Sequence, residues 1–255
     1  MSIYGGEDDI AKFLTPYVES NGISRRVIRA YCGNANGIAE LVYNLILPIQ
    51  YQQVEYIEGT GTQFIDSGLT LSVNNYAIEI DFWLQSKIYS GSDGFIFGCY
   101  GGSDARLNYV IKLNSGGNKQ KLQAGLGLGL AMFSGTADTS NRHTYKVDMK
   151  NLKVYYDNAS ISKTSSGSYS RGTNASAKIG IMCGGSSTGE WYSNCAIGKL
   201  YNCKIWQNDE LIRDYYPCYR KADKVPGLYD IITNIFLTNA GTNSFTIGPK
   251  QTKKL

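Results

Sequence analysis

The sequence predicts an all-β protein, a sandwich of two antiparallel sheets. Three observations predict this fold class. Short apolar runs recur at regular intervals, the chain of 255 residues contains 29 Gly and 20 Tyr, and only 18% of its residues are charged. Glycine-rich turns and tyrosine-rich strands are typical of many short strands joined by tight loops. A chain of this length is also long enough to bury a substantial core.

From Val54 onward the pattern indicates short strands without a long helix between them. The pair Tyr76–Leu84 and His143–Asp148 alternates apolar and polar residues, as half-buried antiparallel strands do. This organisation favours a sandwich or a jelly roll. The other expected strands are Val54–Ile57, Phe64–Ile65, Gly94–Cys99, Tyr109–Leu113, Lys121–Gly125, Lys153–Tyr156, Ala177–Cys183, Ala196–Trp206, Glu210–Tyr216, Gly227–Asp230, Phe236–Leu237 and Ser244–Thr246.

The N-terminal part differs from the rest, so we expect an attachment segment at residues 1–50 and a sandwich domain at residues 51–255. Apolar residues up to Val18 lie near helical spacing, which favours a short helix within residues 1–20. Pro16 limits that helix to one or two turns.

A small repeat follows, in which Asn21-Gly22-Ile23 recurs as Asn36-Gly37-Ile38. The stretch Cys32–Gly37 is a strong turn signal, so we expect a twisted hairpin. Two strands alone are marginally stable in water, and this hairpin must therefore pack on the sandwich, on another copy of the chain or on a larger assembly.

Glycine occupies every second position of Gly125–Leu130. We interpret this stretch as a bulged strand with one face free of side chains, which something could approach closely.

Composition excludes several classes of function. The net charge of +4 comes with short basic segments at 25–29 and 250–254, and no nucleic-acid-binding motif accompanies them. No apolar run approaches the roughly 18 residues of a membrane span, and the acidic N-terminus does not resemble a signal peptide. We therefore expect no nucleic-acid partner, no membrane insertion, and synthesis in a reducing cytoplasm.

The six cysteines form no CxxC pair, and the closest pair, Cys195 and Cys203, has no neighbouring His. We expect free, mostly buried thiols and neither a metal site nor a cofactor. Turn sequences such as Ser90–Asp93 and Ala137–Asn141 contain oxygen ligands, but they lack the density of a calcium loop.

Several stretches, taken in order, carry a family resemblance. They resemble the strands of concanavalin A-like (laminin-G-like) lectin/glucanase-fold domains in phage, prophage and gut-bacterial proteins. The stretches are Val54–Gly68, Ala77–Phe82, Ile197–Trp206, Leu211–Pro217, Gly227–Asp230 and Asn239–Phe245. The N-terminal repeat also resembles a hairpin found in structural proteins of phages. The resemblance implies a two-sheet jelly roll with a small N-terminal hairpin or helix as its anchor.

The resemblance further implies a phage virion structural protein, made in the host cytoplasm. Residues 1–50 would bind other virion proteins of the capsid or tail, and the sandwich would present a lectin-like surface to host glycans. We expect a homo-oligomer, although no coiled-coil heptads demand one. The alternative is a purely structural packing module without a glycan ligand, because this fold hosts both kinds of protein.

Five residues are candidates for glycan binding. Tyr100, Tyr109, Trp191 and Tyr192 lie in or beside loops rich in Gly and Ser, where exposed rings would stack on sugars, and Arg106 would supply hydrogen bonds. The competing interpretation is that these rings cover the edge of the sandwich or a subunit interface, because aromatic residues also dominate interfaces.

A glycoside hydrolase is a more distant alternative. Glucanases of this fold carry Glu-x-Asp-x-Glu on one strand, so that alternate carboxylates face the same cleft. This chain has Glu79 and Asp81 at a similar place, but Trp83 stands at the third position. The single His, His143, is expected to have a structural role at the start of a strand. We therefore predict no catalytic residues and no enzymatic activity.

Overall fold

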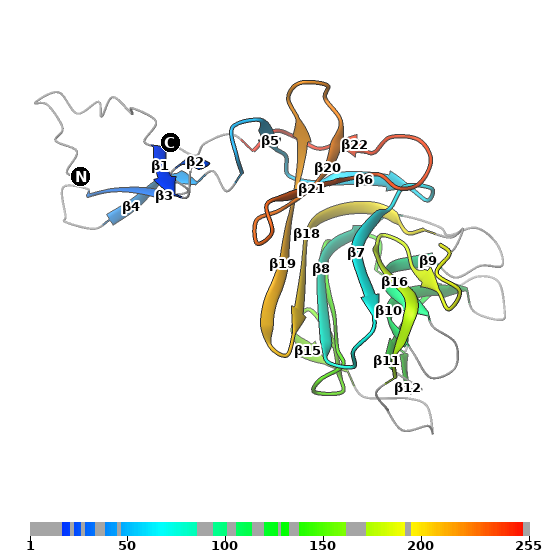
Figure 1. Ribbon diagram of the computed structural model, residues 1–255. Helices are drawn as coiled ribbons and strands as arrows, with labels where there is room; N and C mark the ends of the chain where they lie inside the picture. Colours follow the sequence, from blue (N-terminus) through cyan, green and yellow to red (C-terminus); the bar gives the residue numbers. More distant parts are fainter. Residues whose placement is uncertain are drawn as a thin grey trace, which may run out of the picture.

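The computed structural model describes residues 47–85, 94–100, 106–113, 120–126, 129–132, 138–161, 172–191 and 195–251, together with four strands nearer the N-terminus. In this described part of the chain, all helices and strands assigned are β-strands. It contains no helix that is long and apolar enough to cross a membrane. The strands form a sandwich of two sheets, which Figure 1 shows as two facing layers.

The smaller sheet has seven strands in the described ranges. Six of them follow the order β12-β11-β10-β9-β16-β7 and pair antiparallel, while the short β17 pairs with β9 in parallel. Their bounds are β7 Ile65–Leu71, β9 Gly94–Tyr100, β10 Arg106–Leu113, β11 Gln120–Leu126, β12 Gly129–Met132, β16 Asn174–Ile181 and β17 Gly185–Ser186.

The larger sheet has eleven described strands, eight of them in the order β15-β14-β13-β8-β18-β19-β20-β21. Short strands extend it: β5 pairs with β19, and β6 pairs with both β18 and β22. The bounds are β5 Tyr51–Gln53, β6 Ile57–Thr60, β8 Tyr76–Leu84, β13 His143–Asp148, β14 Lys153–Tyr156, β15 Ala159–Ser160, β18 Ile197–Gln207, β19 Glu210–Arg220, β20 Pro226–Asp230, β21 Ile235–Thr238 and β22 Thr246–Ile247.

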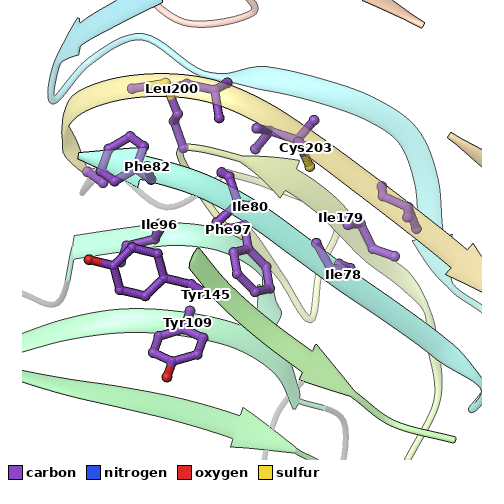
Figure 2. Packing of buried hydrophobic residues seen from close by; sticks show 14 of the residues in the cluster. Ile78, Ile80, Phe82, Ile96, Phe97, Tyr109, Tyr145, Ile179, Leu200 and Cys203 are labelled. Carbon is purple, nitrogen blue, oxygen red and sulfur yellow. The ribbon is translucent and has the colours of Figure 1, made fainter. Parts of the chain in front are cut away.

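The core lies between the two sheets and is made by alternate residues of their strands. On β8 the side chains of Ile78, Ile80 and Phe82 are fully buried, while the residues between them point to the other face. Aromatic rings bridge the layers, since Tyr109 of β10 contacts Tyr145 of β13 with ring centroids 5.2 Å apart (Figure 2).

A polar contact also joins the two layers. The Tyr215 hydroxyl of β19 donates a hydrogen bond to the Ser67 carbonyl of β7 at 3.3 Å. The burial of these rings and of the aliphatic side chains around them is the main stabilising contribution to such a fold.

These observations confirm the all-β, two-sheet antiparallel jelly-roll sandwich. The expected strands overlap β6–β11, β13, β14, β16 and β18–β22, but those expected at β6, β7 and β22 share a single residue with the observed strand. Two local expectations are wrong. Val18 belongs to strand β1 instead of a helix, and Gly125–Leu130 is not one strand, because Leu126 of β11 pairs with Gly129 of the antiparallel strand β12. Residues 1–16, where the rest of the helix was expected, lie outside the described residues.

The N-terminal repeat marks two hairpins. Strands β1 (Tyr17–Ser20) and β2 (Ile23–Arg26) pair with each other, and so do β3 (Arg29–Gly33) and β4 (Ala39–Asn44). Each Asn-Gly of the repeat lies between two paired strands, which is where this dipeptide favours a tight turn. The hairpin expected around Cys32–Gly37 is thus confirmed, and the first hairpin is an addition to it. The division at residue 50 stays a prediction.

Leu47 packs in a small cluster with Cys218 and Tyr229, so the chain already belongs to the sandwich at that residue. Five cysteines are free and buried, as expected: Cys99, Cys183, Cys195, Cys203 and Cys218. Burial raises the pKa of the Cys99 and Cys218 thiols to about 12, so both stay protonated at neutral pH.

Candidate functional site

The five residues that the sequence suggested for glycan binding do not form one site. Tyr100 and Arg106 pair with each other at the ends of β9 and β10. The Arg106 guanidinium donates a hydrogen bond to the Tyr100 hydroxyl at 3.1 Å and lies 4.6 Å from the centre of that ring. The pair is half-buried, and the face of Tyr100 under the guanidinium is not open to a sugar.

Tyr109 lies in the core with none of its surface exposed, so the expectation of an exposed ring there is wrong. Its position explains the error, because Tyr109 is directly opposite Phe97 on β9 and its ring points between the sheets. Tyr192 lies outside the described residues.

Trp191 is half-buried at the edge of the smaller sheet. Its ring contacts Phe64 at a centroid distance of 4.6 Å and packs with Cys183 and Cys195. A Cβ at Gly180 would meet the Trp191 ring at 2.6 Å, so this glycine leaves the space that the indole fills. These contacts favour the interpretation that Trp191 covers the sandwich edge.

A polar pocket of about 350 Å³ lies instead on the outer face of the larger sheet. Its walls come from the central strands β13, β8, β18 and β19, from the residue before β13, from β5 and from the C-terminal segment. The lining residues are Gln53, Glu79, Asp81, Arg142, Thr144, Tyr201, Asn202, Lys204, Tyr216 and Gln251.

A row of alternating charges runs across the strands beside this pocket, and its two middle members, Glu79 and Lys204, line it. Lys146, Glu79, Lys204 and Asp214 are direct neighbours in register on β13, β8, β18 and β19. Opposite charges directly across a strand pair stabilise a sheet. The Lys146 ammonium lies 3.2 Å from the Glu79 carboxylate, which therefore sits between two cationic residues.

The end of the row on β19 is a buried carboxyl group. Asp214 accepts hydrogen bonds from the Asn202 amide at 3.2 Å and from the Tyr216 hydroxyl at 3.4 Å. Burial raises the pKa of Asp214, and the Asn202 amide and the Lys204 ammonium counteract that rise. The pocket thus borders on a carboxyl group that is more easily protonated than an exposed Asp.

A β-bulge shapes the second row of the pocket. On β18 the register with β8 shifts between Leu200 and Asn202, so Tyr201 is an extra residue opposite Asp81. Bulges re-aim side chains and often occur beside functional sites. Here the bulge places Tyr201 and Asn202 next to each other on the pocket wall.

Arg142 closes this side of the pocket. Its guanidinium forms a two-pronged ion pair with Asp81 and lies 3.9 Å from the centre of the Tyr201 ring. On the opposite side Gln53 donates a hydrogen bond to the Gln251 side chain at 2.9 Å, which fixes the C-terminal segment against β5. The wall residues are therefore held in place by contacts within the protein.

The candidate hydrolase residues lie on this same outer face. Glu79 and Asp81 both line the pocket, as their alternation along the strand predicts. Each is paired with a cation, and the Trp83 indole donates a hydrogen bond to the Thr139 carbonyl at 2.9 Å. Among the side chains that the structure describes, no group of three or more His, Cys, Asp or Glu is placed to hold a metal ion.

Most of the pocket residues were not identified from the sequence. The alternation of apolar and polar residues in the sequence of β8 predicts that Glu79 and Asp81 share a face. The positions of Lys204, Asn202 and Arg142 depend on the register of strands far apart in the chain and on a bulge, which no local pattern encodes.

Comparisons with known proteins add little. No protein-family model matches the chain, and no curated protein matches it. Among solved structures, a heptameric SAP-like pentraxin from Limulus polyphemus matches with a TM-score of 0.44 and 11% sequence identity, over 82% of this chain and 100% of that one. The description of the fold therefore rests on the strand pairing of this chain itself.

Proposed function

We propose that the sandwich is a binding module whose pocket on the outer face of the larger sheet takes an uncharged sugar. The observation that carries this proposal is the pocket lining, in which hydrogen-bonding side chains of every kind surround two tyrosines. Its volume lies at the small end of the roughly 300–1,000 Å³ of ligand pockets, which suits one or two sugar rings.

The chemistry of the lining suits hydroxyl groups. Glu79 and Asp81 are acceptors, Arg142 and Lys204 are donors, and the amides offer both. Two carboxylates and two cations line the pocket, so their formal charges cancel. A neutral ligand with many hydroxyl groups fits this balance better than a charged one, because neither sign of charge would find an excess of its opposite.

Sugar binding by the full chain tests this proposal. Glucose, galactose, mannose and N-acetylglucosamine would be titrated individually by NMR, and a glycan array would extend the search to longer chains. Replacing Glu79→Gln or Lys204→Met removes one charged hydrogen-bonding group, so we expect affinity to fall roughly ten- to hundredfold.

Lys150→Met is the matched control, since Lys150 forms an exposed ion pair with Asp209 away from the pocket. Its affinity should equal that of the wild type, and circular dichroism would check that each variant folds. If no sugar binds, or if the pocket variants bind as well as the control, the proposal is wrong.

Packing without a glycan ligand is a second candidate function, and one observation favours it. Ile49, Ile232 and Ile235 expose 50%, 44% and 50% of their surface. Ile49 follows Leu47 closely in the chain and Ile235 directly precedes Phe236, and Leu47 and Phe236 pack in one small hydrophobic cluster. Contact surfaces are marked by apolar residues gathered into one patch, and the packing candidate requires that these isoleucines form one.

We also propose, from the sequence resemblance alone, that the chain is carried on a phage particle and that residues 1–50 attach it there. The two N-terminal hairpins suit such an attachment because isolated hairpins need a partner for stability. Mass spectrometry of purified particles, made with the full-length protein and with a form truncated before Leu47, tests this setting. The full-length protein on the particles and the truncated form in solution would support it.

We propose no enzymatic activity. Glu79 and Asp81 are each held by a cation, and Trp83 stands where a glucanase carries its further carboxylate. Release of reducing sugars from any polysaccharide by the purified full chain would contradict this.

A further inference from the structure

Two of the buried cysteines form a pair. Cys183 and Cys195 belong to one small hydrophobic cluster with Phe64, and Trp191 packs against that cluster. The two thiol groups hydrogen-bond with each other. The edge of the sandwich that Trp191 covers therefore holds two oxidisable sulfur atoms in contact.

The backbone places these two residues opposite each other. Cys183 follows Met182, and Cys195 precedes Ala196, whose amide donates a hydrogen bond to the Met182 carbonyl at 2.9 Å. In an antiparallel arrangement such a bond flanks a pair of facing residues that are not hydrogen-bonded themselves, here the two cysteines. The Cα atoms of such a pair lie about 4.5 Å apart, within the range of roughly 4.4–6.8 Å that a disulfide requires.

Both backbones are tied to β9, which keeps the two cysteines close. The Met182 amide, directly before Cys183, donates a hydrogen bond to the Ile96 carbonyl at 2.8 Å. Cys195 forms an isolated β-bridge with Phe95, the neighbouring residue of the same strand. A bond between the two sulfur atoms therefore requires no rearrangement of the strands.

We propose that Cys183 and Cys195 are an oxidation site, at which hydrogen peroxide converts the two thiols into a disulfide bond that joins the two sheets. Cys183 follows β16 of the smaller sheet, and Cys195 precedes β18 of the larger one. The bond would cross-link the two layers at this edge of the sandwich. This proposal does not depend on the sugar pocket.

Hydrogen peroxide supplies the oxidising equivalents. The sulfur of the first cysteine attacks one peroxide oxygen, the O–O bond breaks, and the sulfur becomes a sulfenic acid while the departing hydroxide takes up the thiol proton as water. The second sulfur then attacks the sulfenic sulfur, which forms the S–S bond and releases the second water. Each sulfur loses one electron, so two thiols and one peroxide give one disulfide and two waters.

Burial determines the course of this reaction. Cys195 keeps 5% of its surface exposed and Cys183 keeps none, so peroxide reaches Cys195 first. The sulfenic acid formed there touches the Cys183 thiol, which captures it before a second peroxide oxidises it further. The hydrogen bond with Cys183, together with burial, raises the pKa of the Cys195 thiol. Because the thiolate is the reacting form, oxidation should be slow at pH 7 and faster at pH 9.

Peptide mapping of the full chain detects the bond. The folded protein would be treated with hydrogen peroxide, then unfolded and alkylated with iodoacetamide without a reductant, and cleaved after Lys and Glu. Both cysteines lie between Lys178 and Lys199, and cleavage after Glu190 separates them. We expect the two fragments to stay linked after oxidation, and to be separate and both alkylated in untreated protein.

Three results of the mapping would overturn the proposal. They are two separate alkylated fragments after peroxide treatment, a sulfinic acid on Cys195, and a bond from either cysteine to Cys32.

Thermal unfolding is the second measurement. A disulfide stabilises a fold mainly by restricting the unfolded chain, so the unfolding midpoint of the oxidised protein should rise by roughly 5–10 °C. Dithiothreitol should reverse the rise. A bond that forms but leaves the midpoint unchanged would show that it does not cross-link the layers.

The variants Cys183→Ser and Cys195→Ser remove one sulfur each. The midpoint of each variant should be the same before and after peroxide treatment, whatever the substitution itself costs. Cys218→Ser is the matched control, since Cys218 is a buried thiol in a different cluster, and it should keep the wild-type rise. A rise that persists in Cys195→Ser, or that disappears in Cys218→Ser, would contradict the assignment of the bond to this pair.

Discussion

The two faces of strand β8 separate what holds this protein together from what it offers to a ligand. Its inward residues Ile78, Ile80 and Phe82 are fully buried between the sheets, where they belong to the main hydrophobic cluster. Its outward residues Glu79 and Asp81 take part in ion pairs across the strands and line a pocket. One strand of nine residues thus contributes to the core and to the candidate site at once.

This contrast between the two faces explains how the site can be polar without weakening the fold. Burial of apolar side chains on the inner face stabilises the sheet whatever lies outside. The outer face is free to vary, and its charges contribute little to stability individually because partly exposed ion pairs are weak. A binding site on this face requires side chains held in fixed positions. Arg142, the bulge at Tyr201 and the charge row hold them.

The largest effect is expected on the inner face. Ile80→Ala removes a fully buried side chain from the middle of the core and should lower the free energy of unfolding by about 2–5 kcal/mol. Chemical denaturation of the full chain measures this loss. Glu79→Ala, one residue away on the same strand, is the matched control and should cost less than about 1 kcal/mol. Similar losses in the two variants would remove the distinction between the faces.

The difference between the two faces of β8 could be predicted from the sequence, because apolar and polar residues alternate along the strand. The pattern of β8 predicts both its inner and its outer residues, and the series of turns predicts the sandwich. The site was harder to predict because proximity on a sheet depends on register. Tyr109 was expected to be exposed because it follows a glycine-rich loop, yet its pairing with Phe97 directs it inward. Lys146 and Lys204 flank Glu79 from β13 and β18, two strands that lie far from β8 in the chain.

Glycine periodicity was equally misleading. Alternate glycines in Gly125–Leu130 have the period of a strand, but Leu126 and Gly129 belong to two antiparallel strands and pair with each other. Glycine is common both in strands where another chain approaches closely and in hairpin turns. The pattern therefore does not separate the two, and only the pairing partners decide.

An intermediate effect is expected at Asp214, the one carboxyl group of the charge row that is buried. Its raised pKa means that the folded protein binds a proton more readily than the unfolded chain. Stability therefore falls as the pH rises from the ordinary Asp pKa of about 3.9 towards the pKa of the folded state. Asp214→Asn removes this dependence. The free energy of unfolding of the variant, relative to that of the wild type, should therefore rise between pH 4 and pH 7. Urea denaturation at both pH values measures the gain.

Asp223→Asn is a control of opposite sign for that experiment. Asp223 is exposed, and its hydrogen bonds with Arg220 lower its pKa. The stabilisation it contributes is present above the ordinary Asp pKa and is lost as the pH falls. The Asn variant should accordingly lose stability relative to the wild type at pH 7 and recover at low pH. If both variants shifted in the same direction, burial would not be the cause of the Asp214 effect.

The smallest effect is expected at a partly exposed ion pair of the outer face, that of Glu79 and Lys146. Both side chains keep 28% of their surface exposed, so solvent screens their attraction. A double-mutant cycle with Glu79→Gln and Lys146→Met should give a coupling energy of roughly 0.2–1 kcal/mol that shrinks further in 1 M salt. A coupling of several kcal/mol, insensitive to salt, would mean that the outer charge row holds the sheet together as the core does. Because Glu79 lies between two cations, the same variants also separate stability from binding: the Glu79 substitution should affect sugar affinity far more than the free energy of unfolding.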